Sequence, residues 1–264
     1  MSTGERGITT ATLGLRRSSQ AAWLATELDN MSGIPISKPP IDESSYFSQP
    51  RKNRFRLSRF SKHIVPIIEH IFHEKGRVKI LDMGGMISYW DPLKEEIEKF
   101  NCHITFLNMS IEDCCGDRAP NEKFSIEVGD GRRCNFPTNS FDFMHSNSTL
   151  EHAGNWRDMQ AMAKEMRRLS QIYYVQVPYF WFPIEPHFRL PFFHWLPEQV
   201  RAKIIMRRGF GFMSKAESVT EAVEAVQSAQ LLDVAQMRAL FPDAHIERER
   251  MVGISKSIIA MKFG

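Results

Sequence analysis

The spacing of apolar residues changes along the chain, and with it the kind of element that each stretch predicts. Between residues 53 and 74 apolar side chains recur every three or four positions, which is the period of a helix that buries one face. Pro66 lies inside this stretch and lacks a backbone N–H, so we expect the helix to kink or split there. Residues 1–45 are rich in Ser, Thr, Gly and Pro and predict an N-terminal extension.

From residue 78 onward, short apolar runs alternate with helical stretches. Strands are predicted over residues 78–83, 103–109, 124–128, 141–145, 172–177, 244–252 and 254–263, and helices over 92–100, over 156–169 and within 216–240. Apolar strands separated by helices predict a parallel sheet covered on both faces. The last two strands are separated by Gly253 alone, so they must be antiparallel. The pattern therefore predicts an α/β fold with a mostly parallel seven-stranded sheet and a C-terminal antiparallel hairpin.

Composition narrows the class of protein. The 264 residues suffice for one sizeable domain with an attached lobe, and the shares of hydrophobic (42%) and charged (25%) residues are those of a soluble globular protein. The net charge of +3 gives no general case for nucleic acid, and no apolar run is long enough to cross a bilayer. The basic run 51–59 is interpreted as the solvated face of a helix. We expect neither nucleic acid nor a membrane as a partner.

The four cysteines indicate a reducing compartment. Cys102, Cys114, Cys115 and Cys134 form no CxxC pair and show no metal-like spacing with histidine. Adjacent cysteines rarely bridge each other, so the natural interpretation is reduced thiols. The residues after Arg16 and Arg17 are too polar for a secretory core. The sequence thus predicts a cytoplasmic protein without a bound metal.

Small or hydrogen-bonding residues follow four successive predicted strands. These residues lie at the carboxyl ends of the strands. In open parallel sheets, ligands bind in the crevice beyond the carboxyl ends. The residues are Asp82, Gly84 and Gly85, then Asn108, then Gly129, Asp130 and Gly131, then Ser146, Asn147, Glu151 and His152. Each one alone is as easily a turn or cap residue. Four strands that end this way on one edge favour a binding site.

The run GDGRRCNFPTNSFDFMHSNSTLEHAGNW, with LDMGG before it, resembles class I S-adenosylmethionine-dependent methyltransferases of the type 11, small-molecule kind. The resemblance covers roughly residues 45–264. It implies a Rossmann-like fold, S-adenosylmethionine as methyl donor or substrate, and an enzyme of small-molecule, secondary metabolism. Residues 46–264 would form the cofactor-binding domain, with 178–240 as a substrate-side loop and helical insertion.

The resemblance also implies roles at the strand ends. Asp82 would hold the methionine end of the cofactor beside Gly84 and Gly85. Asn108 stands at the ribose position, where the family normally has an acidic residue. Asp130 would accept from the adenine amino group, with Gly131 beside it.

Further cofactor contacts are implied around the fourth strand and before the first helix. Ser146 would present its carbonyl to the cofactor's amino group, next to Asn147. The turn at Glu151 would border the reacting centre. Tyr46 and Arg51 could fold over the cofactor as part of a lid. Met86 and Ser88 replace expected glycines, and the full dinucleotide fingerprint is absent, which disfavours a nicotinamide cofactor.

The aromatic segment 178–195 follows the fifth strand, where acceptor sites commonly lie in this family. Tyr179 and Trp181 could surround a sulfonium by cation–π attraction or hold an acceptor. The segment could equally be a hydrophobic plug stiffened by prolines. Bases, if methyl transfer needs one, would come from the acidic and imidazole side chains nearby. The candidates are His152, Glu185, His187 and His194 beside Glu151.

Three functions remain open at this point. The first is methyl transfer to an O or N atom of a small metabolite. The second is cyclisation of S-adenosylmethionine itself to azetidine-2-carboxylic acid, in which its amine attacks the γ-carbon and methylthioadenosine leaves. The third is a non-catalytic cofactor-binding partner. The helices within 216–240 could cover the acceptor site or form a homodimer contact.

Overall fold

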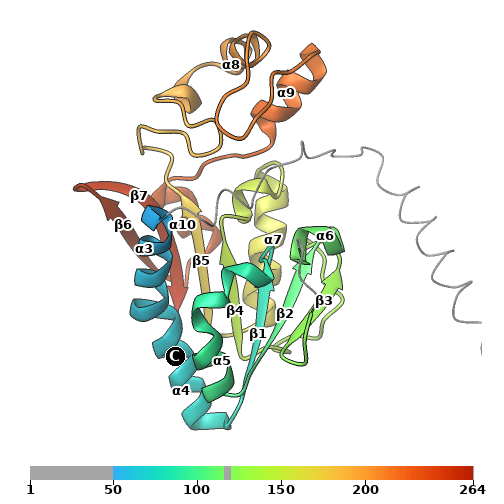
Figure 1. Cartoon of the computed structure of the whole chain (residues 1–264), viewed down its shortest axis with the longest axis vertical. Coiled ribbons are helices and arrows are strands. Elements are labelled where there is room, and N and C mark those ends of the chain that lie inside the picture. The colour runs from blue at the N-terminus through green and yellow to red at the C-terminus, as the bar shows by residue number, and fades with distance from the viewer. Residues whose placement is uncertain (1–49, 116–119, 264) are drawn as a thin grey trace, which may run out of the picture. The chain divides into compact units, whose positions relative to one another are not determined.

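The computed structural model describes residues 50–115 and 120–263, with side chains from Arg54 onward (Figure 1). These residues belong to one compact unit, Ile41–Gly264. The predicted extension 1–45 and Tyr46 lie outside the described residues. Arg51 lies in the first turn of a helix, and its side chain is outside the described part.

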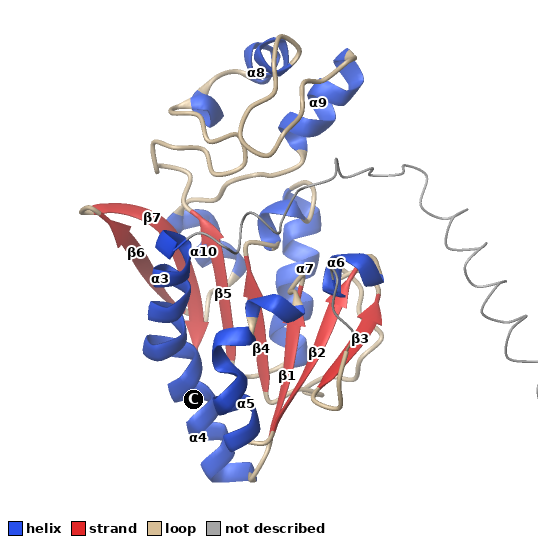
Figure 2. Cartoon of the chain, in the orientation of Figure 1, coloured by secondary structure: helices blue, strands red, loops and turns tan. Residues whose placement is uncertain are grey.

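The described residues form a seven-stranded sheet with the order β3-β2-β1-β4-β5-β7-β6 (Figure 2). The strands are β1 Val78–Met83, β2 Cys102–Asn108, β3 Phe124–Val128, β4 Phe143–Asn147, β5 Tyr173–Pro178, β6 His245–Met251 and β7 Ile254–Lys262. Strands β1 to β5 pair in parallel, and β7 is antiparallel to both β5 and β6. The predicted fold class is confirmed. β4 begins two residues later than predicted, because Asp142 instead accepts a hydrogen bond from the Lys79 backbone N–H.

Helices cover both faces of the sheet. The α-helices of the described residues are α3 Pro50–Arg59, α4 Val65–Lys75, α5 Lys94–Lys99, α6 Ile111–Cys115, α7 Trp156–Leu169, α8 Glu198–Ile205, α9 Val219–Gln227 and α10 Val234–Leu240, and α8 and α9 pack in a separate core away from the sheet faces. The helices α3, α4 and α5 lie on one face, and α7 and α10 lie on the other (Figure 1). Each face has its own apolar core, so the inner strands are buried on both sides, whereas the edge strands β3 and β6 are only partly buried.

The predicted break in the first helix is confirmed. A π-helical turn, Phe60–Ile64, separates α3 from α4, and the Val65 N–H donates to the Phe60 carbonyl. Pro66 then stands in the first turn of α4. A proline is tolerated there because the first backbone N–H groups of a helix need no intrahelical partner. The two helical pieces therefore stay collinear enough to pack Phe60, Ile64 and Ile67 on the same core.

The basic run before this break is not wholly solvated. Arg54 is exposed, as expected, but Arg59 is only 8% exposed. Its Nε and Nη2 donate to both carboxylate oxygens of Glu249 at 2.8 and 2.6 Å, and its Nη1 donates to Asn147 Oδ1 at 2.7 Å. The surface interpretation is wrong for Arg59, because a strand far along the chain brings a carboxylate under the helix.

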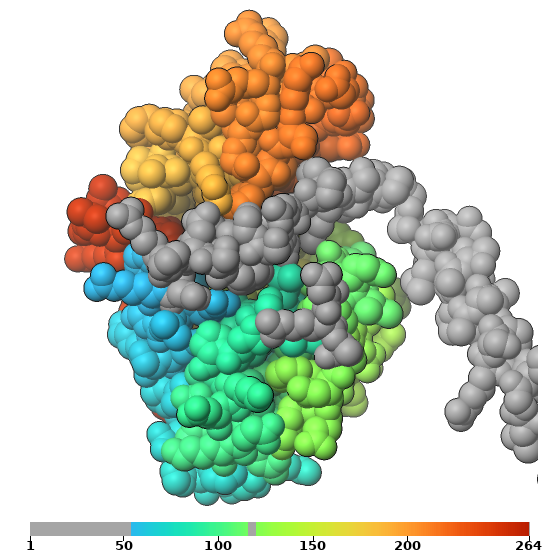
Figure 3. All heavy atoms as spheres, in the orientation of Figure 1, coloured from blue at the N-terminus to red at the C-terminus, as the bar shows by residue number. Residues whose placement is uncertain are grey.

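The chain between β5 and α10 forms a lobe with its own small core (yellow to orange in Figure 3). It includes α8, which the sequence pattern did not predict, and α9. Its buried residues are Phe188, Phe193, Ala202, Ile205, Met213, Ala216, Ala222 and Val226. The lobe lies beyond the carboxyl ends of the parallel strands (Figure 1). Its position therefore brings the segment after β5 to the ligand-binding edge of the sheet.

Candidate active site

The Gly-Gly turn after β1 is filled by the protein's own side chains. Gly84 has a φ of +74°, and a Cβ there would overlap Thr149. A Cβ at Gly85 would overlap the Asp82 carboxylate. Asp82 is fully buried and accepts hydrogen bonds from Trp90 Nε1 and His145 Nδ1, both at 2.7 Å. The Asp82 carboxylate therefore packs against Gly85, and each of its oxygens accepts a hydrogen bond from a side chain of the protein.

The residues at the end of β4 are likewise engaged internally. Ser146 is buried and its Oγ donates to the Met83 carbonyl at 3.0 Å, which links β4 to β1. Asn147 accepts the hydrogen bond from Arg59. These side chains join neighbouring strands, so a contact between Ser146 and a ligand would have to use its backbone carbonyl.

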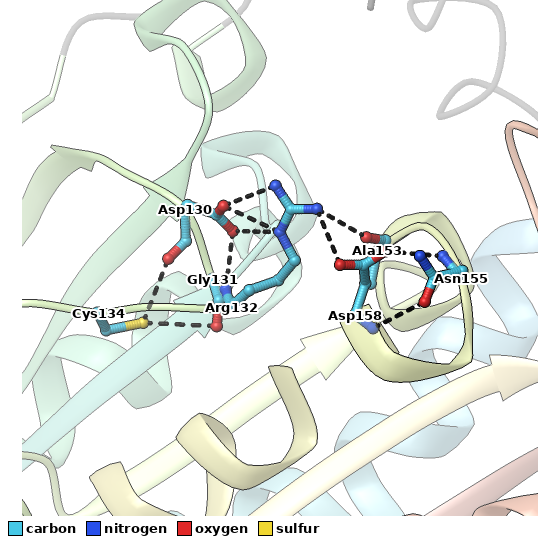
Figure 4. Close-up of polar contacts among 7 residues, drawn as sticks. All are labelled: Asp130, Gly131, Arg132, Cys134, Ala153, Asn155 and Asp158. Carbon is cyan, nitrogen blue, oxygen red and sulfur yellow. Dashed lines mark hydrogen bonds and ion pairs between the residues drawn. The ribbon is translucent and has the colours of Figure 1, made fainter. Parts of the chain in front are cut away.

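Asn108 and Asp130 lie at the ends of the adjacent strands β2 and β3. Asn108 Nδ2 donates to the Gly85 carbonyl at 2.7 Å and ties its strand to the Gly-Gly turn. The Asp130 side chain is 35% exposed and forms an ion pair with Arg132 at 2.7 Å. Figure 4 shows Arg132 between Asp130 on one side and Asp158 with the Ala153 carbonyl on the other. Partial burial raises the pKa of Asp130, but hydrogen bonds from Arg132 hold it below the usual value.

Glu151, His152 and His187 converge beyond β4. Glu151 and His152 belong to the short 3₁₀ turn Leu150–His152, and His187 comes from the aromatic segment after β5. One ligating atom from each of the three side chains lies within 4.8 Å of the other two. The two imidazole rings meet edge to face with centroids 4.9 Å apart. Residues predicted one at a time as candidate bases are therefore brought into a single cluster.

Two groups hold the histidines of this cluster in place. Glu185 Oε1 lies 2.7 Å from His187 Nδ1, and Glu185 Oε2 accepts from the Phe188 N–H at 2.5 Å. The Ser228 carbonyl lies 2.7 Å from His152 Nδ1. Glu185 is thus a positioning residue for His187, and α9's C-terminal end positions His152.

Burial sets the charge state of the cluster. Desolvation raises the pKa of Glu151 to about 7, against the lowering effects of His187 and of the residue's own backbone N–H. Burial lowers the pKa of His187, but the hydrogen bond and charge of Glu185 outweigh it and raise the pKa above its ordinary value. The pKa of Glu151 is thus raised toward neutral pH, and that of His187 lies above its ordinary value.

The aromatic segment packs largely on itself. Trp181 is 56% exposed and contacts the Phe180 ring edge to face. The Phe180 carbonyl accepts from Trp195 Nε1 at 3.1 Å and lies 2.7 Å from His194 Nε2. The Tyr179 ring faces Arg248 at 5.7 Å. The Tyr179 ring therefore already contacts the Arg248 guanidinium. The packing of the segment on itself agrees with the hypothesis of a hydrophobic plug.

A cavity of about 260 Å³ lies in the lobe next to the cluster. Its apolar wall is formed by Phe180, Phe188 and Phe193, and Glu185 lies on its lining. Arg201 also lines it, and the Arg201 Nε is buried without a hydrogen-bond partner among the described residues. The cavity therefore combines aromatic surface with one cationic group and two carboxylates, Glu185 and Glu198.

Sequence reasoning missed three residues whose side chains hydrogen-bond to predicted site residues: one to Asn147 and two to Asp82. Arg59 was hidden in a basic run, His145 inside an apolar strand, and Trp90 beyond the Gly-Gly turn. Only the apolar setting of His145 was a signal, because a polar residue in a buried strand needs a partner. The structure supplies that partner as Asp82 on the neighbouring strand.

A family model described as a methyltransferase domain matches residues 91–171. A search by sequence found no match among curated proteins. Among solved structures, an S-adenosylmethionine-dependent methyltransferase from Methanosarcina mazei is 15% identical, with a TM-score of 0.41 over 73% of this chain and 97% of that one. The magnesium protoporphyrin IX methyltransferase of Synechocystis is 12% identical, with a TM-score of 0.44 over 96% and 100%. Phosphoethanolamine N-methyltransferase 2 of Haemonchus contortus is 15% identical, with a TM-score of 0.41 over 65% and 34%.

The matched residues begin at Asp91, beyond the Gly-Gly turn, and end in the loop before β5, so they include the strand ends with Asn108 and Asp130 but not Asp82, Gly84 or Gly85. No helix in the described part of the chain is long and apolar enough to cross a membrane. The sheet has the parallel order and terminal hairpin predicted with the resemblance. Residues 91–171 therefore resemble a methyltransferase domain, and they lie within a sheet of Rossmann-like order.

Proposed function

We propose that the protein transfers a methyl group from S-adenosylmethionine to an oxygen or nitrogen atom of a small metabolite. When bound, S-adenosylmethionine supplies a methyl group already activated on a sulfonium. The enzyme's task is then to align the acceptor, exclude water and take up the acceptor's proton where the nucleophile carries one.

The strand-end residues fit this cofactor in part. Asn108 Oδ1 accepts no hydrogen bond within the described residues and would suit a ribose hydroxyl, although it brings no charge. Asp130 is half-exposed and ionised, which suits an amino group of the base. Asp82 would act through the turn it supports, and the backbone at Gly84 and Gly85 would form the methionine side. The Asp130 carboxylate already pairs with Arg132. Cofactor binding would therefore have to use the remaining acceptor capacity of Asp130 or break this ion pair.

The observation that carries the proposal is the cavity beside the cluster of Glu151, His152 and His187. Cyclisation of S-adenosylmethionine needs no second substrate, whereas methyl transfer needs room for an acceptor. The cavity of about 260 Å³ is near the lower end of small-molecule sites, so it suits an acceptor of roughly amino-acid size. Arg201 lines the cavity together with the carboxylates Glu185 and Glu198, so the lining suits an acceptor that carries both an anionic group and a hydrogen-bond donor.

The first experiment incubates the purified protein with S-adenosylmethionine and small acceptors that carry a hydroxyl or amine together with a carboxylate. Mass spectrometry then distinguishes the products. S-adenosylhomocysteine that forms only with an acceptor supports methyl transfer, and Glu151→Gln should reduce it where the exposed control Glu127→Gln does not. Methylthioadenosine with a C4 cyclic amino acid, formed without acceptor, would overturn the proposal in favour of azetidine-2-carboxylate synthesis.

A further inference from the structure

The cluster of Glu151, His152 and His187 has the composition of a metal site. Two imidazoles and one carboxylate are the protein ligands of several catalytic zinc centres, which keep another position open. One ligating atom from each residue lies within 4.8 Å of the others. Ligands about 2.1 Å from one ion lie on the order of 3.3 Å apart in a tetrahedron. Small side-chain rotations would therefore close the three groups around a cation.

The hydrogen bonds at Nδ1 of both histidines fix which ring nitrogen carries the proton. The Ser228 carbonyl can only accept, so His152 Nδ1 must carry a proton. Glu185 likewise accepts from His187 Nδ1 when it is ionised. In the neutral form of each ring the lone pair is then on Nε2. Histidines that bind metals almost always donate their other N–H to a carboxylate or carbonyl in this way.

Glu151 gives an independent reason to expect a cation. It is fully buried, and neither carboxylate oxygen accepts a hydrogen bond from another described residue. Burying an unpaired carboxylate is costly, and buried charges normally are paired or coordinate metals. The titratable side chains that act on Glu151 are His187 and Glu185, and neither is Lys or Arg. A divalent ion would satisfy both oxygens.

We propose that Glu151, His152 and His187 bind a divalent transition-metal cation of the zinc type, with Glu185 and the Ser228 carbonyl as supporting acceptors. The two imidazole ligands favour Zn²⁺ or Co²⁺ over Mg²⁺, because Mg²⁺ prefers oxygen ligands and retains water. His152 is exposed, so the ion has a path from solvent. This proposal reverses the expectation of no metal, which rested on sequence spacing alone.

The site deepens the proposed function but does not depend on it. If methyl transfer holds, the open coordination position would take an oxygen of the acceptor and promote loss of its proton. Metal binding is measured without S-adenosylmethionine or acceptor. Failure of metal binding would therefore leave methyl transfer intact, and failure of methyl transfer would leave the metal site intact.

The test uses the untagged full-length chain, treated with a chelator and then dialysed. Isothermal titration with Zn²⁺ alone should show one site, and Mg²⁺ in excess should not displace it. Titration with Co²⁺ alone should produce visible absorption bands of a tetrahedral or five-coordinate centre. A thiolate-to-metal band in the near ultraviolet should be absent, because the proposed ligands include no cysteine.

Variants identify the ligands. Glu151→Gln and His187→Gln should each weaken Zn²⁺ binding at least about tenfold and abolish the Co²⁺ bands. The matched surface controls Glu127→Gln and His73→Gln should bind as the unchanged protein does. Circular dichroism would confirm that each variant is folded. No Zn²⁺ binding, binding that survives both ligand variants, or a Co²⁺–thiolate band would each overturn the proposal.

Discussion

Glu185 and His187 form a hydrogen-bonded pair at 2.7 Å inside the aromatic segment that follows β5. The second oxygen of Glu185 accepts from the Phe188 N–H, and the bridge between Ile184 and Pro191 closes the same loop. The imidazole is thus held by a carboxylate that is itself held by the backbone. A segment that looks like an apolar plug in sequence fixes the orientation of one polar ring.

Replacing Glu185 by Gln tests this orientation. The amide removes the negative charge that raises the pKa of His187, so that pKa should fall. Zn²⁺ affinity should fall about 10- to 100-fold, as for other supporting groups of metal sites. Imidazole NMR titration and calorimetry measure the two effects. The exposed Glu224→Gln in the same lobe is the control, and an unchanged His187 pKa would contradict the assigned role.

Glu151 should make the metal-free protein less stable as the pH rises. The folded pKa of about 7 exceeds the ordinary value of 4.5, so the folded state holds a proton that the unfolded state has lost between these values. Stability is therefore lost between pH 4.5 and about 7, on the order of 3 kcal/mol from this group.

Urea unfolding at several pH values, compared with Glu151→Gln, isolates this contribution. The difference in free energy of unfolding between the two proteins should shift in favour of the variant from pH 4.5 to 7 and then level off. A difference that stays constant with pH would show that Glu151 is solvated or paired in solution.

The pair of Arg59 and Glu249 should be important for stability. Both side chains are nearly buried, and Arg59→Ala would leave the Glu249 carboxylate without its strongest partner. Removing one member of a buried pair costs roughly 3–5 kcal/mol. Chemical denaturation measures this loss. Lys62→Ala breaks a more exposed pair between the π-helical turn and Glu247 of β6, and it should cost less than about 1 kcal/mol.

Asp82 and Asp130 should differ in how they affect cofactor binding. Asp82→Ala leaves Trp90 Nε1 and His145 without an acceptor, so both stability and S-adenosylmethionine affinity should fall. Asp130→Ala removes a half-exposed group and should weaken affinity with a change in stability below about 1 kcal/mol. Calorimetric titration and urea unfolding of both variants measure this. Unchanged affinity in both would contradict the assigned cofactor edge.

The sequence by itself determined the local elements and the class of fold. The helix α7 was predicted at its observed bounds, and the structure shows that Asn155 and Asp158 form a capping box at its start. The strand β3 and the terminal hairpin followed from patterns only a few residues long. The family resemblance was carried by the short motifs at the strand ends.

Tertiary structure alone decided which polar groups meet. Asp82 and His145 are 63 residues apart and Arg59 and Glu249 are 190 apart, and each pair meets because strand order and helix packing bring them together. Glu151 and His187 come from segments on either side of β5 and converge through the path of one irregular loop. The spacing of apolar residues indicates only which face of an element a residue occupies. It does not indicate which distant residue will form a hydrogen bond with it or bind the same metal ion.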